Sequence, residues 1–434
     1  MLEVRLPRRG LGPWANRRSG PWRSAPWGCA VTALLGVAWL SLGGGPASAT
    51  SATPVTGKGF RYRPVGDTTP PVVKPPNDPL FPYQWNLQAI QVPGAWAVSR
   101  GRGATVAVLD SGVAYENRGR YRRAPDLAGT RFVAGWDFVK NDAHPDDVPP
   151  ADGRRTHGTQ IAGIVAETPD NGIGGAGVAP DTSIMPIRVL GPDLSGAAMT
   201  IARGLRFAAD HGANVANLSI AGLAGTRVLK DAIDYAYSKG VTVVAAAGND
   251  GRSQVSFPAA YPKVISVGAV GRDRSRASYS NYGGALDLVA PGGAGEGVDT
   301  GYGPGDGVVA QTVKGGPSQF CYCFTASTSA AAAEVSGVAA LLIGSGRATT
   351  PAEVRRALLA GARPLGSGGW NRQYGAGLVQ AWGALVATDP RPRSTGTSTG
   401  SSGSSWSGSL ILAGVLAVVA GLAFLMRRRR GRRA

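Results

Sequence analysis

The chain has 434 residues, 43% of them hydrophobic, and a formal net charge of +18 at pH 7. Six arginines lie before residue 50 and eight after residue 388, so the middle of the chain keeps 31 basic against 25 acidic residues. Such a mildly basic body argues against a nucleic-acid partner, and we expect none.

Residues 1–49 carry the three parts of a secretory signal peptide. Arginines precede the apolar run CAVTALLGVAWLSL, and the small-residue string GGGPASA follows it, which predicts cleavage after Ala49. A Pro- and Thr-rich extension covers residues 50–77, and at 28 residues it is too short to fold as an independent domain. Either this extension covers the functional cleft and is trimmed, or activation needs no large prodomain.

The expected folded body, residues 78–388, alternates strand-like and helix-like segments. Short runs rich in Val, Ile and Ala predict strands at 104–110, 182–190, 213–220, 241–248 and 264–270. Helical spacing predicts helices at 157–167, 197–212 and 226–240. Because the strands are apolar without alternation, both of their faces are expected to be covered. The fold class is therefore α/β, with a mostly parallel sheet flanked by helices on both faces.

Polar side chains stand where several of these segments end or begin. Asp110 ends the first strand, Asn249 follows the fourth, and Ser329 opens an Ala-rich helical segment. Ligands bind at the carboxyl ends of parallel strands, and a helix N-terminus favours negative charge. An Asp at a strand end is more often structural than catalytic, so these positions alone do not decide the chemistry.

The chain has only three histidines, which narrows any mechanism that needs one. His144 lies in a polar loop and His211 at a helix end, where His is a common cap. His157 opens the segment HGTQIAGIVAE. A first-turn His is usually a polar surface residue, but a His-based nucleophilic mechanism in this chain has to use His157.

The C-terminal region predicts a membrane anchor. A Gly- and Ser-rich linker covers residues 389–408, and the 18 uncharged residues 409–426 approach the lower length limit of a transmembrane helix. The arginine-rich tail at 427–434 is typical of a cytoplasmic flank. We expect a single-pass protein of the cell membrane with an extracytoplasmic body, or one whose anchor is later removed.

The order Asp, His, Asn, Ser along the chain resembles that of the subtilisin-like serine proteases. The resemblance extends over nearly all of residues 78–388. Nine segments in the family's order carry it: VAVLDSGV, HGTQIAGIVA, GVAPDTSIMPIRVL, NVANLSIAG, VVAAAGND, ASYSNYG, LDLVAPGG, TSAAAAEVSGVAALL and YGAGLVQAWGAL.

The resemblance implies a role for each of the four residues. Ser329 would be the nucleophile, His157 the general base, and Asp110 the residue that orients the imidazole. Asn249 and the Ser329 backbone N–H would form the oxyanion hole. The reaction would be peptide-bond hydrolysis through an acyl-enzyme, with a protein or peptide as substrate.

The resemblance also implies a substrate-binding segment, formed by Ser219, Ile220 and Ala221, that pairs with the substrate backbone as an added strand. Ala221 replaces a glycine that is usual in the family, and Ser327 replaces another just before the Thr-Ser pair. Ala333 and Glu334 stand where Pro and often His are usual. These departures bear on the shape of the cleft more than on the chemistry.

The loop at residues 166–180 resembles the ion-binding loop of the same family. The resemblance implies a structural calcium ion, with Asn171 giving a side-chain oxygen and with Asp78 and Asp126 as acidic ligands. The alternative is an ordinary Gly-rich turn with solvated acids.

After cleavage of the signal only Cys321 and Cys323 remain, too few for a disulfide framework. The layout of signal, protease and anchor is also similar to that of the mycosins, although those enzymes usually have paired cysteines that this chain lacks. Our prediction is a monomeric, membrane-tethered serine endopeptidase. A catalytically silent scaffold of the same fold and an esterase of the α/β-hydrolase class are the alternatives.

Overall fold

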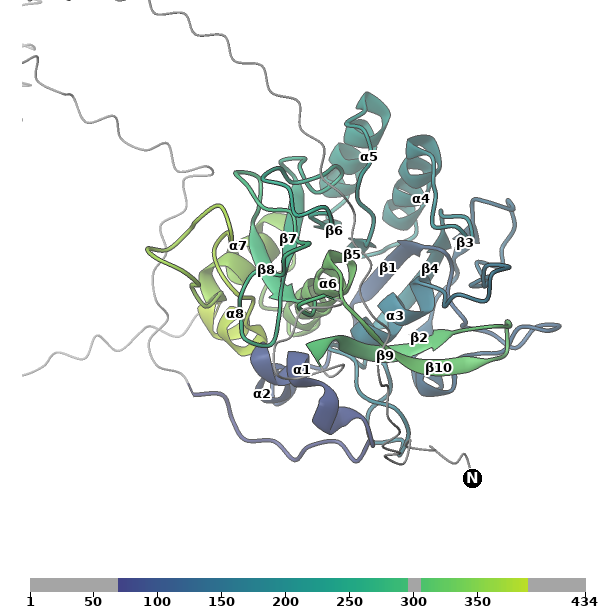
Figure 1. The fold of residues 1–434 in the computed structure, drawn as a ribbon, viewed down its shortest axis with the longest axis horizontal. Coiled ribbons are helices and arrows are strands. Elements are labelled where there is room, and N and C mark those ends of the chain that lie inside the picture. Colours follow the sequence, from purple (N-terminus) through teal and green to yellow (C-terminus); the bar gives the residue numbers. More distant parts are fainter. Residues whose placement is uncertain (1–68, 296–305, 389–434) are drawn as a thin grey trace, which may run out of the picture. The chain divides into compact units, whose positions relative to one another are not determined.

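The computed structural model describes residues 69–295 and 306–388 (Figure 1). The predicted signal peptide, the linker, the predicted span at 409–426 and the basic tail lie outside these residues. Within the described ranges, no helix has the length and apolar character needed to cross a membrane. Residues 69–77 of the N-terminal extension form no helix or strand, and Pro70 lies against Gly94.

The centre of the fold is one sheet in which every pairing is parallel. The strand order is β2-β4-β1-β5-β6-β7-β8, with β3 also paired to β4. The strands are β1 (Thr105–Asp110), β2 (Arg131–Phe132), β3 (Trp136–Asp137), β4 (Ser183–Arg188), β5 (Val215–Leu218), β6 (Thr242–Ala246), β7 (Val264–Val270) and β8 (Leu288–Pro291). All residues of β4 to β8 are buried, as their unbroken apolar runs predict.

Helices cover both faces of this sheet. Neighbouring residues of a strand point to opposite faces, and at the end of β1 they meet different helices. A Cβ added to Gly204 of α4 (Ala198–Asp210) would lie 3.4 Å from Leu109. A Cβ added to Gly158 of α3 (Gly158–Ala166) would lie 3.0 Å from Asp110. The predicted doubly covered α/β sheet is therefore confirmed.

Several of the described helices also pack against one another. Helix α4 packs on α5 (Arg227–Ser238), and α3 packs on α6 (Thr328–Gly344) (Figure 1). Residues 328–342 of α6 are all buried, and small side chains let the helix approach its neighbours closely. A Cβ on Gly337 would lie 2.5 Å from the Val178 side chain. The alanines of this segment therefore form the close-packed centre of the fold.

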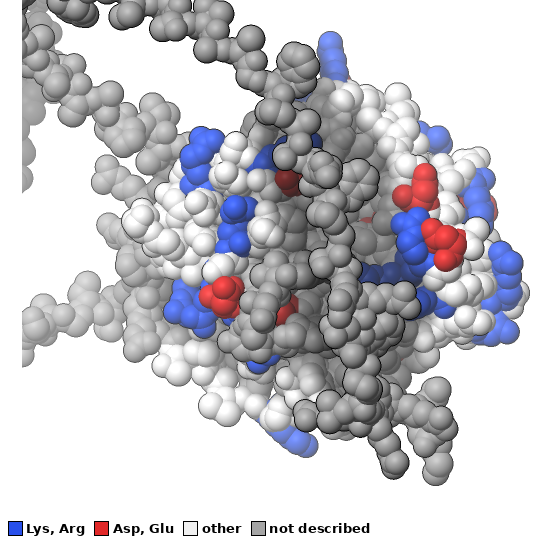
Figure 2. All heavy atoms as spheres, in the orientation of Figure 1, with Lys and Arg blue, Asp and Glu red and all other residues white. Residues whose placement is uncertain are grey.

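An antiparallel hairpin, β9 (Val308–Val313) and β10 (Phe320–Thr325), packs on α3 and leads into α6. The remaining elements are η1 (Phe81–Tyr83), α1 (Trp85–Ala89), α2 (Val92–Trp96), η2 (Pro125–Leu127), α7 (Pro351–Gly361) and α8 (Ala381–Ala387). On the visible described surface, Lys and Arg lie scattered with Asp and Glu among them (Figure 2).

Candidate active site

Five loops and helix ends meet beyond the carboxyl ends of the central strands. Asp110 is the last residue of β1, and Ser219 follows β5. Asn249 follows β6 after a short turn, His157 precedes α3, and Ser329 is the second residue of α6. The parallel sheet thus brings together residues that are far apart in the chain.

The Asp110 carboxylate and the His157 imidazole form the most closely bonded pair of this group. His157 Nδ1 lies 2.8 Å from Asp110 Oδ1 and 2.9 Å from Oδ2. Asp110 is fully buried, and the Ser111 backbone N–H donates to its Oδ1 at 2.8 Å. Because the carboxylate holds Nδ1, the other ring nitrogen, Nε2, is left to face outward.

The electrostatics of this pair favour a protonated imidazole. Burial by itself would lower the pKa of His157, but the charge of Asp110 and its hydrogen bond raise the pKa above its ordinary value. About one-fifth of the His157 side chain (21%) remains exposed, so the ring can still reach a bound molecule. The pair has the electrostatics of a general base that is stabilised once it has taken a proton.

Ser329 is almost fully buried, with 7% of its surface exposed. Its hydroxyl donates to the Ser219 carbonyl oxygen at 3.2 Å, so in this state it does not point to the imidazole. The Ser327 side chain accepts from the Ala330 N–H at 3.2 Å and caps the helix that carries Ser329. The serine that replaces the usual glycine at position 327 is therefore an N-cap.

A chain of buried hydrogen bonds holds the Ser219–Ser329 contact in place. Ser219 Oγ donates to the Ser329 carbonyl oxygen at 2.9 Å, and Asn217 Nδ2 donates to Ser219 Oγ at 2.9 Å. Ser336 Oγ donates to Asn217 Oδ1 at 2.9 Å. The sequence predicts neither the role of Asn217 nor that of Ser336.

Asn249 is oriented by the residue next to Ser329. Its Oδ1 accepts from the Thr328 N–H at 2.9 Å and from Thr328 Oγ1 at 2.8 Å. This network places the Nδ2 amide on the opposite side, toward the cleft. A cavity of about 410 Å³ lies there, and the residues that line it are His157, Leu190, Leu194, Ser219, Ile220, Ala221, Gly222, Asn249, Asp250 and Ser329.

The chain that forms this site is similar to known proteins. The model of the subtilase family matches residues 101–377. This chain belongs to the subtilase family. The match covers more than half of the sequence and includes every residue of the cluster around His157 and Ser329.

Individual relatives agree with this assignment. Thermitase of Thermoactinomyces vulgaris is 42% identical over 218 residues, 50% of this subtilase and 73% of thermitase. The thermophilic serine proteinase of Bacillus sp. (strain AK1) is 39% identical over 302 residues, 69% of this chain and 67% of its own. The solved structure of a protease from Pseudoalteromonas arctica PAMC 21717 superimposes with a TM-score of 0.64 at 32% identity, covering 73% of this chain and all of that one. The chain is a serine-type endopeptidase.

Glu334 is one of the residues that depart from the pattern implied by the resemblance to the family. The side chain is fully buried inside α6, five residues beyond Ser329. Its Oε1 accepts from Asn86 Nδ2 at 2.5 Å, whereas its Oε2 is buried without a partner. Burial raises the pKa of Glu334 to about 8, so the carboxyl group is neutral at pH 7.

The three residues predicted to bind calcium lie close together. They make hydrogen bonds to one another and to backbone groups of the loop at residues 166–180. Asp78 accepts three backbone N–H groups of residues 170–172 at 2.8–3.2 Å. Asp126 accepts from Asn171 Nδ2 at 2.8 Å and from the Gly175 N–H at 3.0 Å. Both acids are buried, so the alternative of solvated acids is wrong. Within residues 69–295 and 306–388, no three His, Cys, Asp or Glu side chains form a group that could hold a metal ion.

These acids form part of a buried cluster of carboxyl groups. Burial, together with the charge of Asp78, raises the pKa of Asp126 to about 6. Burial and the charge of Asp126 raise the pKa of Glu167 well above its usual range. A bound cation would relieve the repulsion between these carboxyl groups. The oxygens of Asp78 and Asp126, however, accept hydrogen bonds from the loop and are not arranged around a common point.

The two remaining cysteines form a disulfide. Cys321 and Cys323 are alternate residues of β10 and therefore lie on the same face of the strand, with their Cα atoms 5.9 Å apart. The closed loop contains a single intervening residue, Tyr322. The expectation that the chain lacks paired cysteines is therefore wrong, although this pair is no long-range crosslink.

Proposed function

We propose that this subtilase hydrolyses peptide bonds of extracytoplasmic proteins with Ser329 as nucleophile, His157 as general base and Asp110 as the residue that orients the base. The observation that carries the proposal is that the buried Asp110 carboxylate accepts from His157 Nδ1, and that His157 and Ser329 line the same cavity. A scaffold without activity would need none of these contacts.

The first step follows from the geometry of Ser329. A rotation of its side chain moves Oγ from the Ser219 carbonyl to His157 Nε2, an adjustment that substrate binding commonly completes. Oγ then attacks the carbonyl carbon of the scissile bond while Nε2 takes the hydroxyl proton. The carbonyl oxygen becomes an oxyanion, and His157 becomes an imidazolium that faces the Asp110 charge.

Asn249 and the start of α6 stabilise that oxyanion. The Asn249 amide is held by Thr328, and the Ser329 backbone N–H belongs to the unpaired first turn of a 17-residue helix. Collapse of the intermediate breaks the C–N bond, and the imidazolium gives its proton to the leaving amine. Water, activated by the same imidazole, then hydrolyses the acyl-enzyme and restores Ser329.

The acyl side of the substrate would bind along Ser219, Ile220 and Ala221, which line the cavity beside Ser329. These residues follow β5 and form part of no helix or strand, so their backbone groups can pair with an extended peptide. An added strand recognises the peptide backbone, and the substrate is therefore a protein or peptide in extended conformation.

A fluorophosphonate probe tests the nucleophile directly. We expect the purified full-length protein to be labelled, and Ser329→Ala to lose the label while keeping the same melting temperature within a few degrees. Ser345→Ala, a change at the other end of α6, should label like the wild type. Absence of label under conditions that label a control subtilase would contradict the proposal.

We further propose that the protease is a monomer anchored in the cell membrane, with the body outside and an overall layout like that of the mycosins. The support is the sequence alone: the signal peptide pattern at 1–49, the apolar run at 409–426 and the arginines after it. Membrane fractionation of cells expressing the chain, with externally added protease, tests it. Recovery in the soluble fraction with the C-terminal tail intact would contradict it.

We also propose that a calcium ion binds beside Asp78, Asp126 and Asn171, because Asp78, Asp126 and Glu167 are buried there without a paired Lys or Arg among the described residues. A ligand present at 100 times its Kd stabilises a fold by about 2.7 kcal/mol. Added calcium should therefore raise the Tm by several degrees, and Asp126→Asn should remove most of this shift. An unchanged Tm in millimolar calcium after chelation would refute the site.

A further inference from the structure

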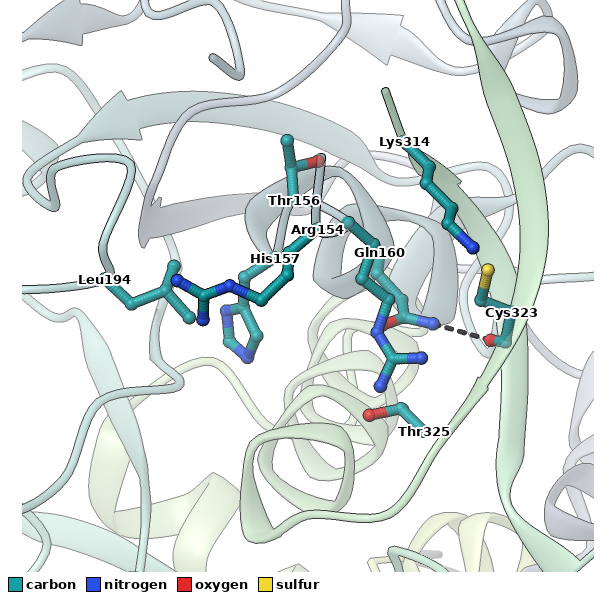
Figure 3. Close-up of a pocket in the computed structure, with 9 residues that line it drawn as sticks. Arg154, Thr156, His157, Gln160, Leu194, Lys314, Cys323 and Thr325 are labelled. Carbon is teal, nitrogen blue, oxygen red and sulfur yellow. Dashed lines mark hydrogen bonds between the residues drawn. The ribbon is translucent and has the colours of Figure 1, made fainter. Parts of the chain in front are cut away.

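A second cavity, of about 450 Å³, adjoins the active-site cavity and shares His157 and Leu194 with it (Figure 3). Its lining comes from the loop before α3 and from the hairpin, including Cys323 and Thr325 of β10. No residue of the segment at 219–222 lines it. The cleft therefore continues past His157, away from the segment proposed to bind the acyl side of the substrate.

The proposed function fixes which part of a substrate enters this second cavity. The imidazolium of His157 gives its proton to the nitrogen of the leaving amine, so the leaving half of the peptide has to pass beside His157. Because the acyl half lies along the other cavity, the residues after the scissile bond extend toward β10. This inference rests on that function and adds a preference to it.

The second cavity is basic. Arg154, Arg155 and Lys314 line it, and no Asp or Glu does. Arg154 is paired with Asp152, whose Oδ2 lies 2.6 Å from its Nε. Within the described ranges, neither Arg155 nor Lys314 has an acidic partner. The charge that remains for a ligand is therefore that of Arg155 and Lys314.

The scaffold holds these two cations side by side. Arg155 and Lys314 form an isolated antiparallel bridge between their backbones, and an Arg155 guanidinium N–H donates to the Phe324 carbonyl at 3.0 Å. The Gln160 amide of α3 donates to the Cys323 carbonyl at 2.6 Å, which fastens β10 to that helix (Figure 3). In the same view Lys314 extends toward Cys323, with His157 on the other side of Gln160.

We propose that this cavity is a subsite for an acidic side chain, Asp or Glu, on the leaving-group side of the scissile bond. Arg155 and Lys314 are its specificity-determining residues. Both are exposed, so each ion pair with substrate is screened by solvent and changes kcat/KM by up to about fivefold. The preference should also weaken as salt is added, since exposed charges are screened over about 10 Å at 0.1 M ionic strength.

Internally quenched peptides test the proposal on the full-length protein. The peptides share one acyl-side sequence and carry Asp, the isosteric Asn, or Lys at each of the first three leaving-side positions. We expect Asp to exceed Asn by about threefold to fivefold in kcat/KM at one or more positions, and Lys to fall below Asn. Lys314→Gln should reduce the ratio, and Lys314→Glu should favour the Lys peptide.

Lys314 is the better site for substitution because, unlike Arg155, its side chain makes no hydrogen bond in the described structure that its loss would disturb. Lys239→Gln is the matched control, since it removes the same charge from an exposed residue at the end of α5. This control should keep the wild-type Asp to Asn ratio. A drop in that ratio equal to the one in Lys314→Gln would overturn the assignment to this cavity.

A nitroanilide with the same acyl-side sequence separates this inference from the function on which it rests. It has no leaving-side residues, so its cleavage by the wild type reports the peptidase reaction without a side chain in the second cavity. Cleavage of the nitroanilide without any preference between Asp and Asn peptides would overturn the acidic subsite and leave the protease intact. Failure to cleave any substrate, with no fluorophosphonate label, would overturn both.

Discussion

Asp110 and Glu334 are both fully buried carboxyl groups, yet their surroundings differ completely. Both Asp110 oxygens lie within hydrogen-bond distance of His157 Nδ1, and a backbone N–H also donates to one of them. Glu334 has one amide partner and one oxygen with none. A buried charge is stable only where partners replace the lost water, so Asp110 can serve the imidazole whereas Glu334 keeps its proton.

The largest effect is expected from breaking the Asp110–His157 pair. Asp110→Asn keeps the shape of the side chain but removes its charge and favours the wrong tautomer of the imidazole. In a Ser-His-Asp mechanism this loss costs about 10⁴-fold in kcat. Peptidase assays should show that fall with the fluorophosphonate site still folded, as judged by an unchanged circular dichroism spectrum.

The same variant should also move the pH profile. The Asp110 charge raises the pKa of His157, so its removal lowers that pKa. The acid limb of kcat/KM, which reports the free imidazole, should shift to lower pH in Asp110→Asn. Activity within tenfold of the wild type, or an acid limb that stays in place, would show that His157 does not depend on Asp110.

The second effect concerns Glu334, the buried carboxyl group with one unpaired oxygen. The pKa of Glu334 is raised from an ordinary 4.5 to about 8, so the folded state holds a proton that the unfolded chain releases between these values. Stability therefore falls as pH rises from about 4.5 to 8, and the loss is complete above pH 8. Glu334→Gln removes this titration while keeping the Asn86 contact.

We expect Glu334→Gln to match the wild type near pH 4 and to exceed it above pH 8, by a few kcal/mol and several degrees of Tm. Thermal unfolding from pH 4 to 9 measures the difference. Glu353→Gln, a change in the exposed capping box of α7, is the matched control and should show no gain at high pH. A wild-type Tm that does not fall between pH 5 and 8 would contradict a proton on Glu334.

The sequence predicts a feature of the structure best when the feature is formed by residues that are close together in the chain. The strands at 104–110 and 264–270 are apolar runs bounded by turn residues, and they appear within a few residues of the predicted ends. The sequence points to Asp110 and Asn249 because they end or follow such strands, and to His157 and Ser329 because they open helical segments. The carboxyl-end rule for parallel sheets then brings them together.

Some features that the sequence does not predict depend on contacts between distant segments. The hairpin β9–β10, whose strands pair with each other, is also not predicted, and it packs on α3. The hydrogen bond from Ser336 to Asn217 joins residues 119 positions apart. A serine amid alanines in a packed helix gives no local sign of such a partner.

Ser336 adds a third case to the comparison of Asp110 and Glu334. It is a buried neutral group whose hydroxyl makes a hydrogen bond. Ser336→Ala removes the donor to Asn217 Oδ1 and leaves that oxygen buried and unpaired, which costs about 1–3 kcal/mol. Because Asn217 also holds Ser219, whose carbonyl accepts from Ser329, we expect a small fall in kcat as well. A Tm equal to the wild type would show that water or a rearranged side chain replaces the bond.

The smallest effect is expected at Ser327, a partly exposed residue whose hydrogen-bonded side chain lies at the start of the same helix. Its side chain caps α6 through the Ala330 N–H, so Ser327→Ala should lower stability by about 1 kcal/mol. Ser327→Gly, which restores the residue usual in the family, should cost only a few tenths of a kcal/mol, because glycine is itself an accepted N-cap. Denaturant unfolding of the two variants measures the difference. If Ala and Gly prove equally destabilising, the Ser327 side chain does not stabilise the helix as a cap. Its role beside Ser329 would then lie in substrate binding.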